Sequence, residues 1–273
     1  MSDVLTRIAA ALERLSPAQS APAEWRAAPG YFWDGAARPV AQIVAPRLDL
    51  LKGIDAQKDL VTANVNRLAA GHAAHDMLLW GSRGMGKSAL LRASVAAAQQ
   101  ADPAAIALVQ VAPEALGSLA ALFAALGSEP RRFLVFIDDL GFEEGDSTGP
   151  RALRSWLEGG VEARPGNARI AVTSNRRAIV PRHLSEQDDP INPRDAVDDR
   201  LALADRFGLS IGFHNCSQDD YLAIVAGYAA ANGLVWEETQ ALEWAKRRGA
   251  RSGRVAWQFV TELAGRAGKA LSI

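Results

Sequence analysis

Short apolar runs alternate with helical patterns through the middle of the chain. Because each run is largely apolar without strict alternation, it predicts a strand covered on both faces, as in a mainly parallel sheet. The intervening segments have the length and spacing of helices, so we expect an α/β fold. The predicted strands are MLLW (77–80), AIALVQV (105–111), RFLVFIDD (132–139), ARIAVTSN (168–175) and LSIGFH (209–214).

A helix is predicted from residue 53 onward, where Leu60, Val61, Val65 and Leu68 recur at three- and four-residue spacing and Gly71 follows as a stop. A further helix is expected after the glycine-rich segment 81–86, through about residue 99, and another near residues 114–126.

The predicted strands stop after about residue 216. Three helical patterns follow, at roughly 217–232, 237–248 and 254–268, and together they predict a small helical lid. Trp244 and Trp257 fall on apolar faces of these helices, so we expect both in the core.

The amino-terminal part has weaker patterns. Residues 16–30 are rich in Pro, Ala and Ser and read as a linker, and residues 31–46 have no clear period and read as an irregular arm. The expected organisation is an N-terminal helix and linker (1–29), an α/β nucleotide-binding domain with its arm (30–215) and a helical lid domain (216–273).

Composition narrows the function classes. Thirty basic against 31 acidic residues argue against a surface built for nucleic acid, although a local basic patch is compatible with this balance. Cys216 is the only cysteine, which excludes an intrachain disulfide and favours a reducing compartment. No window has the apolar length of a membrane span, so the expected location is cytoplasmic.

The segment GSRGMGKS matches the phosphate-loop pattern G-x-x-x-x-G-K-[ST] directly after a predicted strand. Glycines let the backbone curl there, and the following helix turns its positive end toward one anion. Lys87 would neutralise the β- and γ-phosphates of ATP, and the Ser88 hydroxyl would ligate Mg²⁺. The residues assigned to this loop are Gly81, Ser82, Arg83, Gly84, Met85, Gly86, Lys87, Ser88 and Ala89.

Two further strands end in polar residues. Asp138 and Asp139 follow one of them, which suits Asp138 to holding Mg²⁺ and Asp139 to orienting or deprotonating water. Thr173, Ser174 and Asn175 end another strand at the edge where ligands bind in parallel sheets. Asn175 is the first candidate to contact water or the γ-phosphate, with Thr173 and Ser174 as rivals.

Arginines supply the remaining candidates. Arg206 precedes the last predicted strand and would stabilise charge at a neighbouring subunit's nucleotide, with Arg200 as its competitor. Arg254 follows Ser252 at the predicted start of a lid helix and would swing onto the phosphates. The arginine-rich run at 247–254 has an alternative interpretation as a solvated or nucleic-acid-binding face.

Together these elements resemble the AAA+ class of phosphate-loop ATPases, and more narrowly a bacterial family of ATP-binding proteins known as a domain of unknown function. GSRGMGKS is similar to Walker A, FLVFIDD to Walker B, Asn175 to sensor 1, Arg206 to the arginine finger and Arg254 to sensor 2. The resemblance covers about residues 30–265 and implies that Gly53, Ile54 and Asp55 approach the adenine. Asp139 stands where Glu is commoner in the class.

The function that follows is an ATP hydrolase that binds ATP and Mg²⁺, acts as a homo-oligomer with its arginine finger in trans, and remodels or loads an unidentified protein partner. One alternative is an ATP-gated adaptor with little basal hydrolysis. Another is a DNA-associated ATPase of the helicase-loader type.

Overall fold

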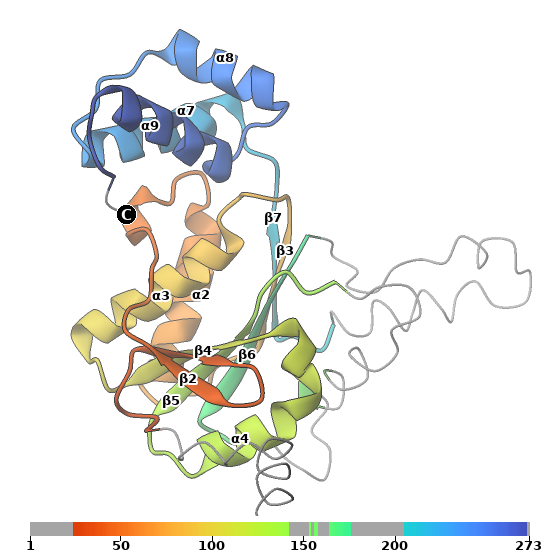
Figure 1. Cartoon of the computed structure of the whole chain (residues 1–273). Coiled ribbons are helices and arrows are strands. Elements are labelled where there is room, and N and C mark those ends of the chain that lie inside the picture. Colours follow the sequence, from red (N-terminus) through yellow and green to blue (C-terminus); the bar gives the residue numbers. More distant parts are fainter. Residues whose placement is uncertain (1–23, 142–152, 154–155, 158–163, 176–204, 272–273) are drawn as a thin grey trace, which may run out of the picture.

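The computed structural model describes residues 24–141, 153, 156–157, 164–175 and 205–271. Within this part, seven strands form one sheet in the order β2-β1-β4-β5-β6-β3-β7 (Figure 1). They are β1 (Gly30–Trp33), β2 (Ala37–Val40), β3 (Met77–Gly81), β4 (Ile106–Val111), β5 (Arg132–Ile137), β6 (Ala168–Ser174) and β7 (Leu209–Phe213). The pair β1–β2 is antiparallel and the other neighbours are parallel, so the expected α/β sheet is confirmed.

The helices of the described residues lie on both faces of this sheet and beyond its carboxyl edge. They are α2 (Asp55–Ala69), α3 (Lys87–Ala101), α4 (Leu119–Gly127), α7 (Gln218–Ala231), α8 (Glu238–Arg248) and α9 (Gly253–Arg266), with the 3-10 turns η1 (Leu48–Leu50) and η2 (Pro113–Ser118). None of them is long and apolar enough to cross a membrane.

Side chains of the central strands alternate between two apolar layers. In β3, Met77 and Leu79 pack with α2 and α3, whereas Leu78 packs with α4 on the other face. All three are fully buried, which explains why the sequence shows a continuous apolar run rather than an alternating one. Figure 1 shows α2 and α3 together beside the sheet, with α4 away from them.

The predicted irregular arm is instead a hairpin. Strand β1 pairs with β2 on one side and runs parallel to β4 on the other, so the hairpin extends the sheet by two strands. Tyr31 and Trp33 are buried two residues apart on the same face, and Trp25 packs on Tyr31 with ring centroids 4.7 Å apart. The strands are four residues each, too short for their period to stand out in the sequence. Trp25, in the predicted linker, belongs to the core.

Two helix details differ from the prediction. Leu60 was expected on the inner face of α2 but is 48% exposed, while Asn64 is buried and binds the backbone of His75 through both its amide atoms. Apolar periodicity misses Asn64 because its burial depends on those two hydrogen bonds. The helix expected at 114–126 is divided into η2 and α4.

The three carboxy-terminal helices α7, α8 and α9 form the predicted lid, seen in blue at the carboxyl edge of the sheet in Figure 1. Val255 and Phe259 of α9 and Ile224 of α7 belong to the same apolar cluster as α2 and α3. The lid therefore shares one apolar cluster with α2 and α3, and α7 contacts the turn η1 that precedes α2.

Candidate functional site

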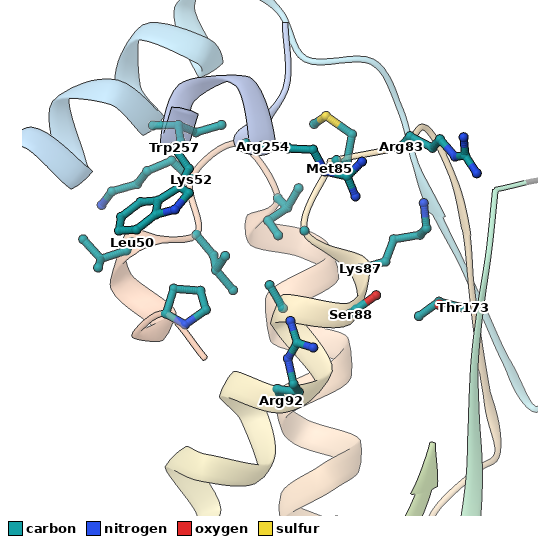
Figure 2. A pocket seen from close by; sticks show the side chains of 18 of the residues that line it. Leu50, Lys52, Arg83, Met85, Lys87, Ser88, Arg92, Thr173, Arg254 and Trp257 are labelled. Carbon is teal, nitrogen blue, oxygen red and sulfur yellow. The ribbon is translucent and has the colours of Figure 1, made fainter. Parts of the chain in front are cut away.

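A pocket of about 430 Å³ lies between the carboxyl edge of the sheet and the lid (Figure 2). Its walls come from the segment before α2, the phosphate loop, the ends of β5 and β6, and the helices α7 and α9. The lining residues are Pro46, Leu50, Leu51, Lys52, Ile54, Arg83, Gly84, Met85, Gly86, Lys87, Ser88, Ala89, Arg92, Asp138, Asp139, Thr173, Asn175, Ile224, Tyr228, Gly253, Arg254 and Trp257.

The phosphate loop curls where its glycines allow positive φ. Gly81 ends β3 with φ +121°, and a Cβ atom there would stand 2.1 Å from the Phe213 carbonyl oxygen of β7. Only glycine fits such an approach. The Ser82 N–H donates to that same carbonyl at 2.9 Å, so the start of the loop is fixed to the edge strand.

Lys87 is the first residue of α3 and lies almost entirely inside the pocket wall, 7% exposed. Its ammonium group donates to the carbonyls of Gly81 (2.7 Å) and Ser82 (2.9 Å) and to the Asn175 side chain (3.3 Å). Burial lowers the pKa of Lys87, and the nearby carboxylates oppose that shift only in part. The charge is thus held in a poorly solvated position, which favours an anionic ligand.

Ser88 and Asp138 meet as the sequence predicts. The Ser88 hydroxyl donates to Asp138 Oδ1 at 2.6 Å, and the Thr173 hydroxyl donates to the same oxygen at 2.7 Å. Hydroxyl and carboxylate oxygens are the ligands that Mg²⁺ prefers, so this pair fits a magnesium ion bound beside a phosphate. The hydrogen bond from Thr173 holds the Asp138 carboxylate in its position.

Asp139 has an unusual backbone for a non-glycine residue, with φ +51°. Its N–H donates to the Thr173 hydroxyl at 2.8 Å, and its carboxylate accepts a hydrogen bond from the Asn175 amide. Arg83 of the phosphate loop lies 3.6 Å from the other carboxylate oxygen. These contacts hold Asp139 in a left-handed conformation that aspartate tolerates better than most residues.

The three rivals at the end of β6 separate in the structure. Thr173 and Asn175 both line the pocket, whereas Ser174 is buried outside it. Because side chains alternate along a strand, residues two apart reach the same face. Asn175 contacts Lys87 and Asp139, so it joins the phosphate loop to the second of the two adjacent acids.

Arg254 reaches the pocket from the lid. Helix α9 begins beside it, and Ser252 caps the helix by accepting from the Val255 N–H. The backbone N–H of Arg254 donates to the Gly84 carbonyl at 3.2 Å. The amino end of α9 thus meets the phosphate loop directly, and Figure 2 shows the Arg254 side chain beside Met85 and Arg83.

The far end of the pocket is aromatic and apolar, and the sequence reasoning missed most of it. Trp257 was expected in the core but is partly exposed, lies one helical turn after Arg254 and lines the pocket. Tyr228 packs against it edge-on with ring centroids 5.0 Å apart. Figure 2 places Leu50 and Lys52 beside Trp257, away from Lys87 and Ser88. The three-residue spacing between Arg254 and Trp257 was the available signal.

Three of the candidate residues, Asp55, Ser82 and Arg206, lie away from the pocket. Ile54 lines it, but its neighbour Asp55 is exposed and paired with Lys58 at 2.7 Å. Ser82 donates to Asn215 in the connection to the lid, at 2.6 Å. Because these contacts hold Asp55 and Ser82 elsewhere, neither residue lines the pocket.

The third, Arg206, precedes β7, at the amino edge of the sheet. The strand itself separates that edge from the pocket side by roughly 13 Å. Arg206 therefore does not line the pocket of its own chain. Arg200, its competitor, lies outside the described residues.

Solved structures with a similar fold include the RuvB Holliday junction branch migration motor of Thermotoga maritima. It is 18% identical, with 84% of this chain and 68% of that chain covered and a TM-score of 0.54. The Aeropyrum pernix ORC2 protein in its ADPNP and ADP complexes is 17% identical, with 84% and 67% covered and a TM-score of 0.54. At these identities the likeness shows the fold alone, and it confirms the expected α/β core followed by a helical lid.

No curated protein matches the chain. One family model does, over residues 23–267, and its description is "Protein of unknown function (DUF815)". The match begins earlier than the residue 30 expected from motifs, in agreement with the packing of Trp25 into the core. The chain therefore belongs to the DUF815 family.

Proposed function

We propose that this protein binds ATP with Mg²⁺ and hydrolyses it. The observation that carries the proposal is the connected set of contacts around Thr173. Its hydroxyl joins the carboxylate paired with Ser88 to the backbone of Asp139, while Lys87 contacts Asn175 beside them. A plain glycine turn between strand and helix would not need this polar network behind it.

Each residue has a role that its position supports. Lys87 and the N–H groups at the start of α3 bind the phosphates, and Arg254 approaches them from the lid. Ser88 and Asp138 hold Mg²⁺, which when bound neutralises charge on the phosphate oxygens. Asp139 orients the attacking water, with Asn175 fixing the carboxylate.

Arg206 completes the site in trans. In its own chain it stands at the opposite edge of the sheet, so a contribution to catalysis requires a second subunit that presents this edge to the pocket. The protein is then a homo-oligomer, and hydrolysis changes the angle between core and lid. This motion acts on an unidentified macromolecular partner.

Phosphate release from ATP by the purified protein tests the proposal. Lys87→Ala removes the buried charge and is expected to abolish release, while Lys246→Ala, at an exposed position of α8, is expected to leave it unchanged. Release by Lys87→Ala at the wild-type rate would refute the assignment.

Asp139→Asn separates a hydrolase from an ATP-gated switch. Asparagine tolerates the same left-handed backbone, so the variant removes charge without backbone strain. A hydrolase loses turnover and keeps ATP binding in this variant. A switch binds ATP but shows negligible turnover already in the wild type.

The arginine-rich run at 247–254 gives little support to the alternative of a DNA-associated ATPase. Arg247 pairs with Glu243 one helical turn away, and the Arg248 guanidinium lies 4.8 Å from the Trp244 ring centroid. Both side chains are thus engaged on their own helix. Salt-sensitive DNA binding that is lost in Arg247→Ala with Arg248→Ala would favour this function.

A further inference from the structure

Arg92 is a basic residue of the pocket that neither the motifs nor the proposed roles explain. It lies on α3, four residues after Ser88, and lines the same cavity. Residues four apart on a helix share a face, and the rise between them is about 6 Å. Arg92 therefore stands one turn deeper along α3 than the residues assigned to the β- and γ-phosphates and Mg²⁺.

The guanidinium of Arg92 has no partner of its own among the described residues. No ion pair or hydrogen bond joins it, and its Nε atom is buried without an acceptor. A buried donor without a partner is unfavourable unless a ligand or water supplies the acceptor. In Figure 2 the side chain rises from α3 toward Ser88, as helical side chains do when they point to the amino end.

The charge balance of the pocket indicates what that ligand group is. Five basic side chains line the cavity (Lys52, Arg83, Lys87, Arg92 and Arg254) against two carboxylates (Asp138 and Asp139), a formal excess of three positive charges. Such an excess suits a polyphosphate. The apolar end near Leu50 and Trp257 suits the base, so the group between the two ends is the phosphate next to the sugar.

We propose that Arg92 binds the α-phosphate of the nucleotide. The planar guanidinium matches two phosphate oxygens at once, and the Nε donor that lacks a protein acceptor can then gain one. This inference rests on the proposed ATP binding and adds a contact that distinguishes the α-phosphate from the β- and γ-phosphates held by Lys87.

Equilibrium binding of ATP tests it with wild type, Arg92→Gln and Arg92→Lys, and with Arg266→Gln, at an exposed position of α9, as the matched control. Loss of a charge-assisted hydrogen bond corresponds to roughly 10- to 100-fold weaker binding for Arg92→Gln. Arg92→Lys keeps the positive charge but loses the planar guanidinium, so its ATP affinity should lie between those of the wild type and Arg92→Gln. Arg266→Gln should bind as the wild type does, because Arg266 pairs with Glu262 on its own helix and does not line the pocket.

The two diastereomers of ATPαS give a second readout that does not depend on how much protein is folded. Each replaces one non-bridging α-oxygen by sulfur, a poor acceptor. The wild type is expected to prefer one diastereomer, and Arg92→Gln to lose at least about two thirds of that preference. An unchanged preference with unchanged ATP affinity would overturn the inference. Absence of ATP binding by the wild type would instead refute the proposed function.

Discussion

The backbone N–H of Arg254 donates to the carbonyl of Gly84 at 3.2 Å, which joins the first turn of the lid helix α9 to the middle of the phosphate loop. A second link lies at the other end of the lid connection, where Ser82 donates to Asn215. The loop that would hold phosphates is therefore in direct contact with the lid at Arg254 and with the connection to the lid at Asn215. A ligand that moves the loop must also bias the position of the lid.

Gly84→Ala should disrupt this contact. Gly84 has φ +75°, and a Cβ atom there would stand 2.9 Å from the Ser252 hydroxyl and 3.1 Å from Arg254 Cβ. The variant adds backbone strain and pushes the lid away, so ATP affinity should fall at least about tenfold while the protein stays folded. Isothermal titration measures the affinity. Gly117→Ala, whose Cβ would meet nothing within 4 Å, is the control and should bind normally.

Thr173→Val removes a buried hydroxyl and preserves shape. The change removes one of the two hydroxyls that donate to Asp138 Oδ1 and leaves the Asp139 N–H without its acceptor, a cost of about 1–3 kcal/mol. Because Thr173 supports the acids from behind, we expect turnover to drop by roughly tenfold or more, with ATP affinity changed less than about threefold. Thr173→Ser keeps the hydroxyl and should restore turnover. Equal turnover in Thr173→Val would show that the network is not needed.

Trp257 should report on the base. Stacking of a base on an aromatic ring contributes about 1–3 kcal/mol, so Trp257→Ala should weaken ATP binding roughly tenfold. The chain has seven tryptophans, and most of the ATP-induced change in intrinsic fluorescence should disappear in Trp257→Phe. Trp244→Phe should keep that change, since Trp244 packs on Phe259 away from the pocket. A signal that survives in Trp257→Phe would place the base elsewhere.

ATP affinity should decline on the alkaline side earlier than an ordinary lysine allows. Burial lowers the pKa of Lys87 from its usual 10.5, so in the free protein the neutral form appears at a lower pH. Binding needs the charged form, and affinity is therefore full below the lowered pKa and lost as pH rises through it. Binding measured across alkaline pH checks this. Lys87→Arg stays charged and should show no such decline where it binds at all.

Much of the site was already predictable because short sequence segments carry it. Gly81–Ser88 and Asp138–Asp139 lie next to strong apolar runs, and a parallel sheet brings the carboxyl ends of its strands to one edge. The same logic predicted the strands themselves and the three lid helices. Local pattern and one topological rule were sufficient for these features.

The remaining features depend on tertiary packing. The exposure of Leu60, the burial of Asn64 and the pairing of β1 with β4 follow from contacts between segments far apart in the sequence. The roles inferred for Trp257 and Arg92 also depend on tertiary packing. A tryptophan on an apolar helix face is expected in the core, and only the position of the lid shows that Trp257 lines the pocket together with Arg92. The sequence by itself determined the α/β class, the phosphate loop and its acids, since adjacent residues encode them. Only the tertiary structure decided which side chains close the pocket, because that depends on how the lid sits over the sheet.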